Sequence, residues 1–415
     1  MKNALRVQHG QPGLVSKRIC LILLSFFVVN LAFTQQVKIL FDATKAEAAG
    51  NADWVIDANA HNLGYSSGPA ILNAGSESNP QRLPDPVQSA VIANTPETYW
   101  MGALSFWAID CVKKGYQVET LPYNGRITYG DGTNPQDLSN YKAYIICEPN
   151  ILFTLAEKTA ILSFVSSGGG LFMIGNHSGA DRNNDGFDPP VIWNDLMQNN
   201  ASGNSNPFGL LFDQLDFSQT SSNLAALPAN DSILHGEMGN VTTVKWSNGT
   251  SITLDPAANA NVKAVVYRSN VAGATGNTGV MVACSRYGSG KLVAIGDSSP
   301  CDDGTGDVND GLFPGYNGDV SPNHRNLLMN STIWLVTDAH HSYTFTGNGN
   351  WDISSNWAGG LVPPAILAAG DTIIINHEGG GECILNITQQ ITAGAELIVR
   401  TGKNLVIPGE LLIQQ

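Results

Sequence analysis

GGGLFMIGNHSG, residues 168–179, joins a short apolar run to a group of polar residues. Leu171–Ile174 has the length and composition of a buried strand, and three glycines precede it. Asn176, His177 and Ser178 follow at once, and an acidic loop comes after them. This order predicts a strand whose carboxyl end carries polar groups. Such a place could be the rim of an active site or a turn stiffened by calcium.

The flanking segments alternate between strand and helix patterns. Short apolar runs predict strands at 37–41, 116–121, 142–147, 262–268, 279–285 and 291–295. Helical spacing predicts helices over 99–114, from Thr154 to about 167, and from Ser321 onward. Thr154 and Glu157 form a capping-box pattern at the start of the second helix. Because strands separated by helices pair in parallel, we expect an α/β domain over 35–338, with helices on both faces of a parallel sheet.

Two further segments differ from this alternating pattern. Residues 176–240 are rich in Asn, Asp, Ser, Gly and Pro and are too long for an ordinary connection, so we expect an insertion that shapes a site. Residues 341–415 contain short strand-like runs separated by glycine-containing turns. Their spacing predicts a small all-β module, either a sandwich or the first coils of a parallel β-solenoid.

The first 34 residues have the character of a secretory signal peptide. They carry four basic and no acidic side chains, and an apolar stretch over 19–33 that is short for a membrane span. Cleavage near Thr34 leaves 17 basic against 35 acidic side chains, a net charge of about −18. We expect a secreted or cell-surface protein, with no membrane insertion after cleavage and no nucleic-acid partner.

Catalytic candidates come from the predicted carboxyl ends of three strands and from the last helix. Ligands of parallel α/β sheets bind beyond these strand ends. The candidates are Asp42, Glu47, His177, Asp297 and His324. In this interpretation His177 is a general base or a metal ligand. The alternative is a turn histidine that is hydrogen-bonded to the acidic loop.

A divalent cation, with calcium as the first choice, is the expected cofactor, and no nucleotide cofactor is expected. Asp181–Gly186 matches the first half of a calcium loop, with oxygen ligands at alternate positions and a glycine at the sharp turn. The metal candidates are Asp181, Asn183, Asp185, Asp188 and Asp303. Ile192 occupies the position of the usual bidentate glutamate, so a complete EF-hand is excluded. A plain loop of Asx-turns is the alternative.

The order of elements resembles the class I glutamine amidotransferase-like fold. This flavodoxin-like group also includes the trehalose-utilisation (ThuA-like) proteins and the N-terminal domain of an intraflagellar-transport protein. The residues that carry the resemblance are 38–42, 168–175, 290–297 and the helix with Leu327, Ile333 and Trp334. Amidotransferases of this group have cysteine at the elbow and a late His-x-Glu, whereas this chain has His177 and His324-Arg325-Asn326. The resemblance therefore implies the fold and argues against glutamine hydrolysis.

The C-terminal segment has a resemblance of its own. Trp351–Pro364, with Gly370–Asn376 after it, is similar to the opening of β-solenoid repeats in bacterial surface proteins. Together with the leader, the chain resembles exported proteins of Bacteroidetes-type bacteria whose function is not established.

Two functions are compatible with these patterns. The first is a secreted, metal-supported hydrolase acting on an extracellular small molecule or glycan, such as an ester or a sugar. The second is a non-catalytic surface protein that binds a glycan or partner, with calcium stiffening its loops. The hydrolase predicts that the His177 ring lies within hydrogen-bond reach of Asp42, Asp297 or His324. Separate positions for these groups favour the binding protein.

Overall fold

The computed structural model describes residues 36–58, 81–228, 231–306, 310–337, 342–367, 371–392 and 394–414. The predicted signal peptide, 1–34, lies outside the described residues. Within them, no helix is both long enough and apolar enough to span a membrane.

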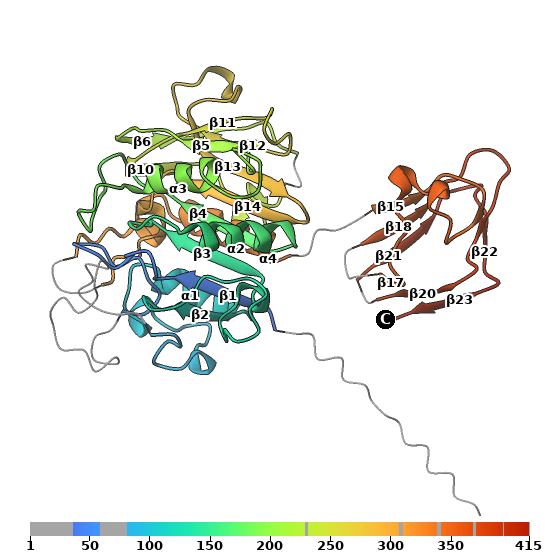
Figure 1. The fold of residues 1–415 in the computed structure, drawn as a ribbon, viewed down its shortest axis with the longest axis horizontal. Helices are drawn as coiled ribbons and strands as arrows, with labels where there is room; N and C mark the ends of the chain where they lie inside the picture. The colour runs from blue at the N-terminus through green and yellow to red at the C-terminus, as the bar shows by residue number, and fades with distance from the viewer. Residues whose placement is uncertain are drawn as a thin grey trace, which may run out of the picture. The chain divides into compact units, whose positions relative to one another are not determined.

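A ten-stranded central sheet organises the α/β domain (Figure 1). Five neighbouring strands are parallel, in the order β2 (Gln117–Leu121), β1 (Lys38–Asp42), β3 (Ala143–Cys147), β4 (Gly170–Ile174) and β14 (Gly290–Ile295). The rest is antiparallel and comprises β13 (Val280–Tyr287), β12 (Lys263–Tyr267), β11 (Ile252–Leu254), β5 (Leu210–Phe212) and β7 (Asn223–Leu224). The prediction of a parallel sheet is correct for these five strands. The sheet as a whole is mixed, because β12 and β13 follow each other without an intervening α-helix and pair antiparallel.

Each face of the sheet has its own apolar core. Every residue of β3, β4 and β14 is buried, as expected for strands covered on both faces. Alternate residues of β4 point to opposite faces, so Phe172 belongs to one core and Leu171 to the other. The helices α1 (Ser105–Lys113) and α4 (Asn323–Val336) pack on the first face, while α2 (Leu155–Ser166) and α3 (Pro189–Gln198) pack on the second. Helices on both faces are therefore confirmed.

Local signals explain where the helices begin. The Thr154 side chain accepts a hydrogen bond from the Glu157 amide, and the Glu157 carboxylate accepts one from the Thr154 amide, so the capping box is confirmed. The helix predicted over 99–114 is shorter than expected, because a 3-10 turn (Glu97–Tyr99) and a bend precede α1. Further short helical turns are η1 (Gln88–Ala90), η3 (Leu138–Asn140), η4 (Ala272–Ala274), η5 (Ser299–Cys301) and the π-turn η6 (Gly315–Asp319).

The segment predicted as an insertion, 176–240, forms part of the domain framework. It contributes α3 to one face and the strands β5 and β7 to the central sheet. Its remaining strands are β6 (Phe217–Ser221), which pairs with β10 (Val244–Gly249), and the short pair β8 (His235–Gly236) and β9 (Gly239–Asn240). The polar composition reflects the many turns between these short elements.

The C-terminal module is built from three small sheets, each of three parallel strands. Its strands are β15 (Ser342–Phe345), β16 (Gly349–Asn350), β17 (Ile366–Leu367), β18 (Thr372–Ile375), β19 (Cys383–Ile384), β20 (Thr388–Ile391), β21 (Glu396–Val399), β22 (Leu405–Val406) and β23 (Glu410–Ile413). Every third strand joins the same sheet, so successive coils of the chain add one strand to each. A sandwich of antiparallel strands does not have this pairing. Phe345, Trp351 and Trp357 lie in the core of the module, so these aromatics are internal.

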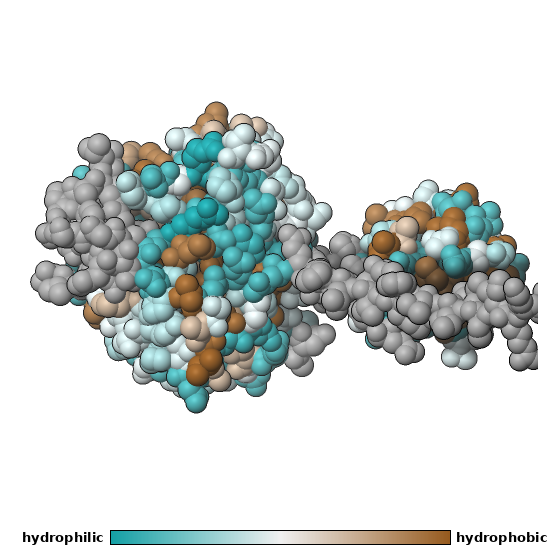
Figure 2. Space-filling view, turned by 90° about the horizontal axis from the view of Figure 1, so that it is seen from below, coloured by the Kyte–Doolittle hydropathy of each residue, from teal (hydrophilic) through white to brown (hydrophobic). Residues whose placement is uncertain are grey.

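The surface shown in Figure 2 is mostly hydrophilic on the α/β domain, where polar residues flank a narrow, broken line of apolar ones. That face therefore shows no broad apolar patch of the kind that marks a binding site. In the C-terminal module, by contrast, the last coil exposes several large apolar side chains, namely Val399, Val406, Ile407, Leu412 and Ile413.

Candidate functional site

A pocket of about 520 Å³ lies beyond the carboxyl ends of the parallel strands. Asn176 and His177 follow β4, Ser298 and Ser299 follow β14, and Asn51 and Trp54 come from the loop after β1. The other lining residues are Arg182, Ser247, Asn248, Asp302, Gly311, Leu312 and Phe313. A site at this edge of the sheet agrees with the place expected for a ligand in such a fold.

Glu148, directly after β3, is the central carboxylate beneath this pocket. Its side chain is fully buried, and it accepts a hydrogen bond of 2.7 Å from the Ser298 hydroxyl. It also forms an ion pair with Arg182. The backbone of Glu148 has φ of 53°, a left-handed conformation that is uncommon for residues other than glycine. Such strain concentrates at functional sites because the surrounding contacts must hold it in place.

Sequence reasoning missed Glu148, although a signal was present. The residue follows the apolar strand at 143–147 in the same way that His177 and Asp297 follow theirs. The expectation that ligands bind beyond the carboxyl ends of parallel strands applied equally to Glu148.

Arg182 connects the buried carboxylate to the wall of the pocket. Its guanidinium donates to the side-chain oxygen of Asn51 at 2.6 Å and lies 5.9 Å from the ring centroid of Trp54. Burial by itself would lower the pKa of Arg182, but the neighbouring Glu148 carboxylate raises it above the ordinary value. The pocket therefore contains a permanent positive charge whose position is fixed by three neighbours.

His177 lines the pocket but is not joined to the other predicted catalytic groups. Its Nδ1 lies 2.9 Å from the Ser178 carbonyl oxygen and 3.8 Å from a carboxylate oxygen of Asp216. About a quarter of its side chain is exposed. No hydrogen bond connects His177 to Asp42, Asp297 or His324 among the described residues. His177 lies in a turn, as in the alternative interpretation, but the contacts of its ring are with Ser178 and Asp216 and not with the acidic loop.

Asp42 and Glu47 are together, as the sequence predicted, but they lie below the pocket and do not line it. Both carboxyl groups are buried. Tyr144 donates its hydroxyl proton to Asp42 at 2.7 Å, and the Lys45 amide donates to Glu47 at 2.7 Å. Burial raises the pKa of both carboxyls, and the Asp42 charge raises that of Glu47 further. The two carboxyls are therefore buried acids of the fold that lie outside the pocket lining.

The side chains of Asp297 and His324 are each held by hydrogen bonds to backbone groups. The Asp297 carboxylate accepts from the Ser247 amide at 2.6 Å and from the Ser299 amide at 3.0 Å, and burial raises its pKa to about 7. The His324 ring is fully buried between the Gly315 carbonyl oxygen, 2.8 Å from Nδ1, and the Lys245 amide, 2.9 Å from Nε2. Burial lowers the pKa of His324 to about 4, so the ring is neutral at pH 7. Within the described residues, the structure joins neither Asp297 nor His324 to the His177 ring by a hydrogen bond.

The acidic loop forms the Asx-turns that the sequence left as an alternative to calcium. Asp181 accepts from the amides of Asp185 and Gly186, at 3.1 Å and 2.7 Å. Asp185 accepts from the Phe187 amide at 3.0 Å. The side-chain Nδ2 of Asn183 donates to the Asn150 backbone carbonyl oxygen at 2.5 Å. These bonds define the turn by protein contacts.

Asp188 and Asp303, the other metal candidates, act as helix caps. Asp188 accepts from the Val191 amide at 3.0 Å and is the N-cap of α3. Asp303 accepts from the Phe106 amide at 2.7 Å, near the start of α1, where Leu104 has no side chain able to cap. Burial raises the pKa of Asp303 to about 6. In the described part of the chain, no three His, Cys, Asp or Glu residues are grouped so that they could hold a metal ion.

Asp302 adds an acid to the pocket wall. Its oxygens accept from the Gly304 amide at 2.9 Å and the Phe313 amide at 2.7 Å. Burial, followed by the charges of Asp303 and Asp310, raises the pKa of Asp302 to about 8. At pH 7 the group is a neutral acid that can donate a hydrogen bond.

Comparisons with known proteins supply little beyond this geometry. No protein-family model matches the chain, and no curated protein matches it. Among solved structures, the chain is similar to one described as "mmIFT52 N-terminal domain", with 14% sequence identity and a TM-score of 0.41. The similarity covers 73% of this chain and 99% of that one. A likeness of this degree carries no conclusion about function.

Proposed function

We propose that this protein binds a neutral glycan in the pocket at the carboxyl edge of the sheet. One observation carries the proposal: the pocket combines several amide and hydroxyl groups with an aromatic wall. Its polar lining consists of Asn51, Asn176, Asn248, Ser247, Ser298, Ser299, His177, Arg182 and Asp302. Trp54, Leu312 and Phe313 provide the apolar surface. Sugars present alternating donors and acceptors with apolar C–H faces, and this lining complements both.

Binding is favoured over hydrolysis because the predicted catalytic side chains are not assembled. His324, Asp297 and the Asp42–Glu47 pair are each engaged in their own buried contacts, away from the His177 ring. A general base must lie within hydrogen-bond reach of the group that it deprotonates.

Three further inferences concern the setting of this function. The order β2-β1-β3-β4-β14 of the parallel strands corresponds to the flavodoxin-like order, which supports the expected relationship to the amidotransferase-like fold. The three parallel sheets of the C-terminal module support a β-solenoid. Together with the signal-like leader and the acidic composition, this module supports an exported, surface-located protein. Mass spectrometry of the exported protein tests this, and a first residue near Gln35 is expected.

The binding proposal is tested by titrating the purified protein with a panel of neutral oligosaccharides in a calorimeter. His177→Ala removes a partly exposed lining side chain without breaking a buried ion pair, and we expect the Kd of the best ligand to rise about tenfold. His235→Ala is the matched control, because His235 is exposed and does not line the pocket. Equal affinities of both variants and the parent, or no saturable binding across the panel, would contradict the proposal.

A hydrolase is the second candidate, and the strained Glu148 favours it. Its carboxylate is 2.7 Å from the Ser298 hydroxyl, a distance at which a carboxylate can accept the proton of a nucleophile. Glu148→Gln keeps the size of the side chain, and Ser298→Ala removes the hydroxyl. If the parent cleaves an ester or glycan and both variants lose that activity while retaining glycan affinity, the protein is an enzyme. Metal analysis of the same preparations tests whether a divalent cation accompanies it.

A further inference from the structure

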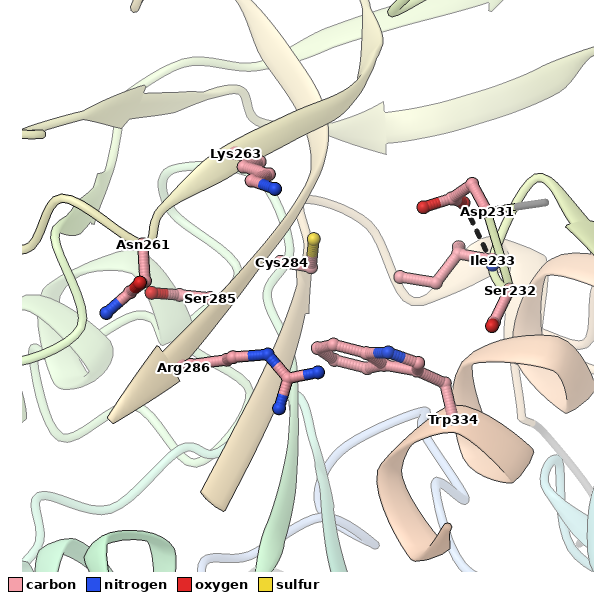
Figure 3. A pocket seen from close by; sticks show the side chains of 9 residues that line it. All are labelled: Asp231, Ser232, Ile233, Asn261, Lys263, Cys284, Ser285, Arg286 and Trp334. Atoms are coloured by element: carbon pink, nitrogen blue, oxygen red, sulfur yellow. Dashed lines mark hydrogen bonds between the residues drawn. The ribbon is translucent and has the colours of Figure 1, made fainter. Parts of the chain in front are cut away.

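A second cavity, of about 310 Å³, lies at the opposite edge of the sheet (Figure 3). Its residues on β13 are Cys284, Ser285 and Arg286, and Arg286 is paired with Lys291 at the beginning of β14. Lys291 is in turn the register partner of Gly170, the first residue of β4. The cavity is therefore at the amino ends of the parallel strands, whereas the glycan pocket is at their carboxyl ends. The other lining residues are Asp231, Ser232, Ile233, Asn261, Lys263 and Trp334.

Two cations in this cavity are without an acidic partner. Within the described residues, neither Lys263 nor Arg286 forms an ion pair with a carboxylate. This is notable in a chain with a net charge of −14, where Lys38, Lys45 and Lys158 are all paired. Two unpaired cations beside one cavity favour an anionic ligand, and a carboxylate is a planar acceptor that suits a guanidinium.

The position of Arg286 is set by an aromatic side chain. Its guanidinium carbon is 5.6 Å from the ring centroid of Trp334, and Figure 3 shows the guanidinium directed toward the indole. Contact with an aromatic face restrains the arginine while leaving its N–H groups free to donate. The anion-binding group is thus partly preorganised.

One acidic side chain, Asp231, and several neutral polar groups complete the lining. Asp231 uses Oδ1 to accept from the amides of Ile233 and Leu234, at 2.9 Å each, which fixes its position. Figure 3 shows Asp231 and Ser232 across the cavity from Asn261 and Lys263. A ligand with hydroxyl groups can donate to the Asp231 carboxylate while its own acid meets the cations. An anion without hydroxyl groups has nothing to donate to Asp231, so its interaction with that carboxylate is repulsive.

The cavity is suited to binding and not to covalent chemistry. Cys284 is its one thiol among the lining residues, and burial raises the pKa of this thiol to about 12. The thiolate is the nucleophilic form, so Cys284 is unreactive at neutral pH.

We propose that this cavity is a second binding site, specific for an acidic sugar such as a hexuronate, with Lys263 and Arg286 holding its carboxylate and Asp231 accepting from its hydroxyls. The site does not depend on the neutral-glycan pocket, since the two share no lining residue.

The test is calorimetric titration of the purified protein with glucuronate, glucose and acetate. Glucuronate and glucose differ only in the carboxylate, and acetate supplies the carboxylate without the sugar. We expect saturable binding of glucuronate, with glucose and acetate at least about tenfold weaker, because each lacks one set of contacts. Equal affinity for glucose would contradict the role of the two cations, and equal affinity for acetate would contradict recognition of the sugar hydroxyls. Absence of glucuronate binding would overturn the site.

Variants locate the binding. Lys263→Gln and Arg286→Gln change exposed side chains and should each raise the Kd for glucuronate about tenfold. Arg268→Gln is the matched control: it follows the same strand as Lys263 and has no acidic partner in the described chain, but it does not line the cavity. An unchanged Kd in both cavity variants would overturn the proposal. His177→Ala should leave glucuronate binding intact, which separates this site from the neutral-glycan pocket.

Discussion

Glu148 and Arg182 show how single residues define the sheet-edge pocket. The carboxylate is fully buried and the guanidinium mostly so, and the charge of each compensates that of the other. The pair holds Glu148 in its left-handed conformation and presents Arg182 to the pocket. The strain at this position is thus stabilised by an ion pair and by the Ser298 hydroxyl.

Removing Arg182 tests the importance of this pair for stability. Arg182→Ala leaves the Glu148 carboxylate buried and uncompensated, so we expect the free energy of unfolding in urea to fall by about 3–5 kcal/mol. Arg126→Ala is the control, because Arg126 pairs with Asp131 at 2.9 Å on the exposed surface. Its loss should cost less than about 1 kcal/mol. Similar losses in the two variants would show that the buried pair has no special role.

The buried acids Asp297 and Asp302 predict a pH dependence of stability. Their pKa values of about 7 and about 8 mean that the native state retains protons that the unfolded chain has already lost, since an ordinary Asp has a pKa of about 3.9. The free energy of unfolding therefore falls as pH rises from 6.5 to 8, by at most about 1.4 kcal/mol per pH unit for each group. This window avoids His324, whose lowered pKa acts in the opposite direction below pH 6.5.

Asp302→Asn should make this dependence weaker, because the amide does not titrate. Urea unfolding at pH 6.5, 7.2 and 8.0 measures the slopes for the parent and the variant. Asp302→Asn also loses one acceptor for a backbone amide, so a lower stability at every pH is expected and does not affect the comparison. A parent whose stability is constant or rises over this range would refute the raised pKa values.

At the level of elements, α2 depends on its capping box. Thr154→Ala removes the acceptor for the Glu157 amide and should lower the free energy of unfolding by about 1 kcal/mol. Thr159→Ala is the control: Thr159 is exposed within the same helix, where alanine has the higher helix propensity. We therefore expect Thr159→Ala to be neutral or slightly stabilising in the same urea titration. Equal destabilisation by both variants would argue against the cap.

At the level of the whole molecule, the described residues form separate apolar cores. Trp357 is buried in the C-terminal module, with ring centroids 5.2 Å from Phe345 and 4.9 Å from Trp351. This core shares no residue with the two cores of the α/β domain. In one of the two cores of the α/β domain, Trp193 is the corresponding buried aromatic residue, and its ring lies between Phe153 and Phe212.

Calorimetry should therefore resolve two thermal transitions. Trp357→Ala should destabilise the module by about 3–5 kcal/mol and lower one transition only. Trp193→Ala should lower the other, by a similar amount. A single transition that both variants shift equally would mean that the module and the domain unfold as one unit.

Local patterns of sequence determined much of this fold. The apolar runs at 37–41, 142–147 and 291–295 gave the parallel strands, and Thr154 with Glu157 gave the start of α2, because these signals act between residues close in the chain. The antiparallel pairing of β13 with its chain neighbours β12 and β14 was missed, although a local signal was present: only Gly288 and Ser289 separate β13 from β14. The pairing of β11 with β5 is different, because it joins strands that are far apart in the chain.

The candidate site was likewise predictable from the sequence only in part. The sequence by itself determined that polar residues would gather at the carboxyl edge of the sheet, since strand direction fixes where each strand ends. Only the tertiary structure decided their roles. It buried His324, Asp42 and Glu47, and used Asp188 and Asp303 as helix caps. It also brought Glu148, Arg182 and Ser298 together from three separate segments. Burial and pairing arise from contacts between residues far apart in the chain, and no local pattern encodes them.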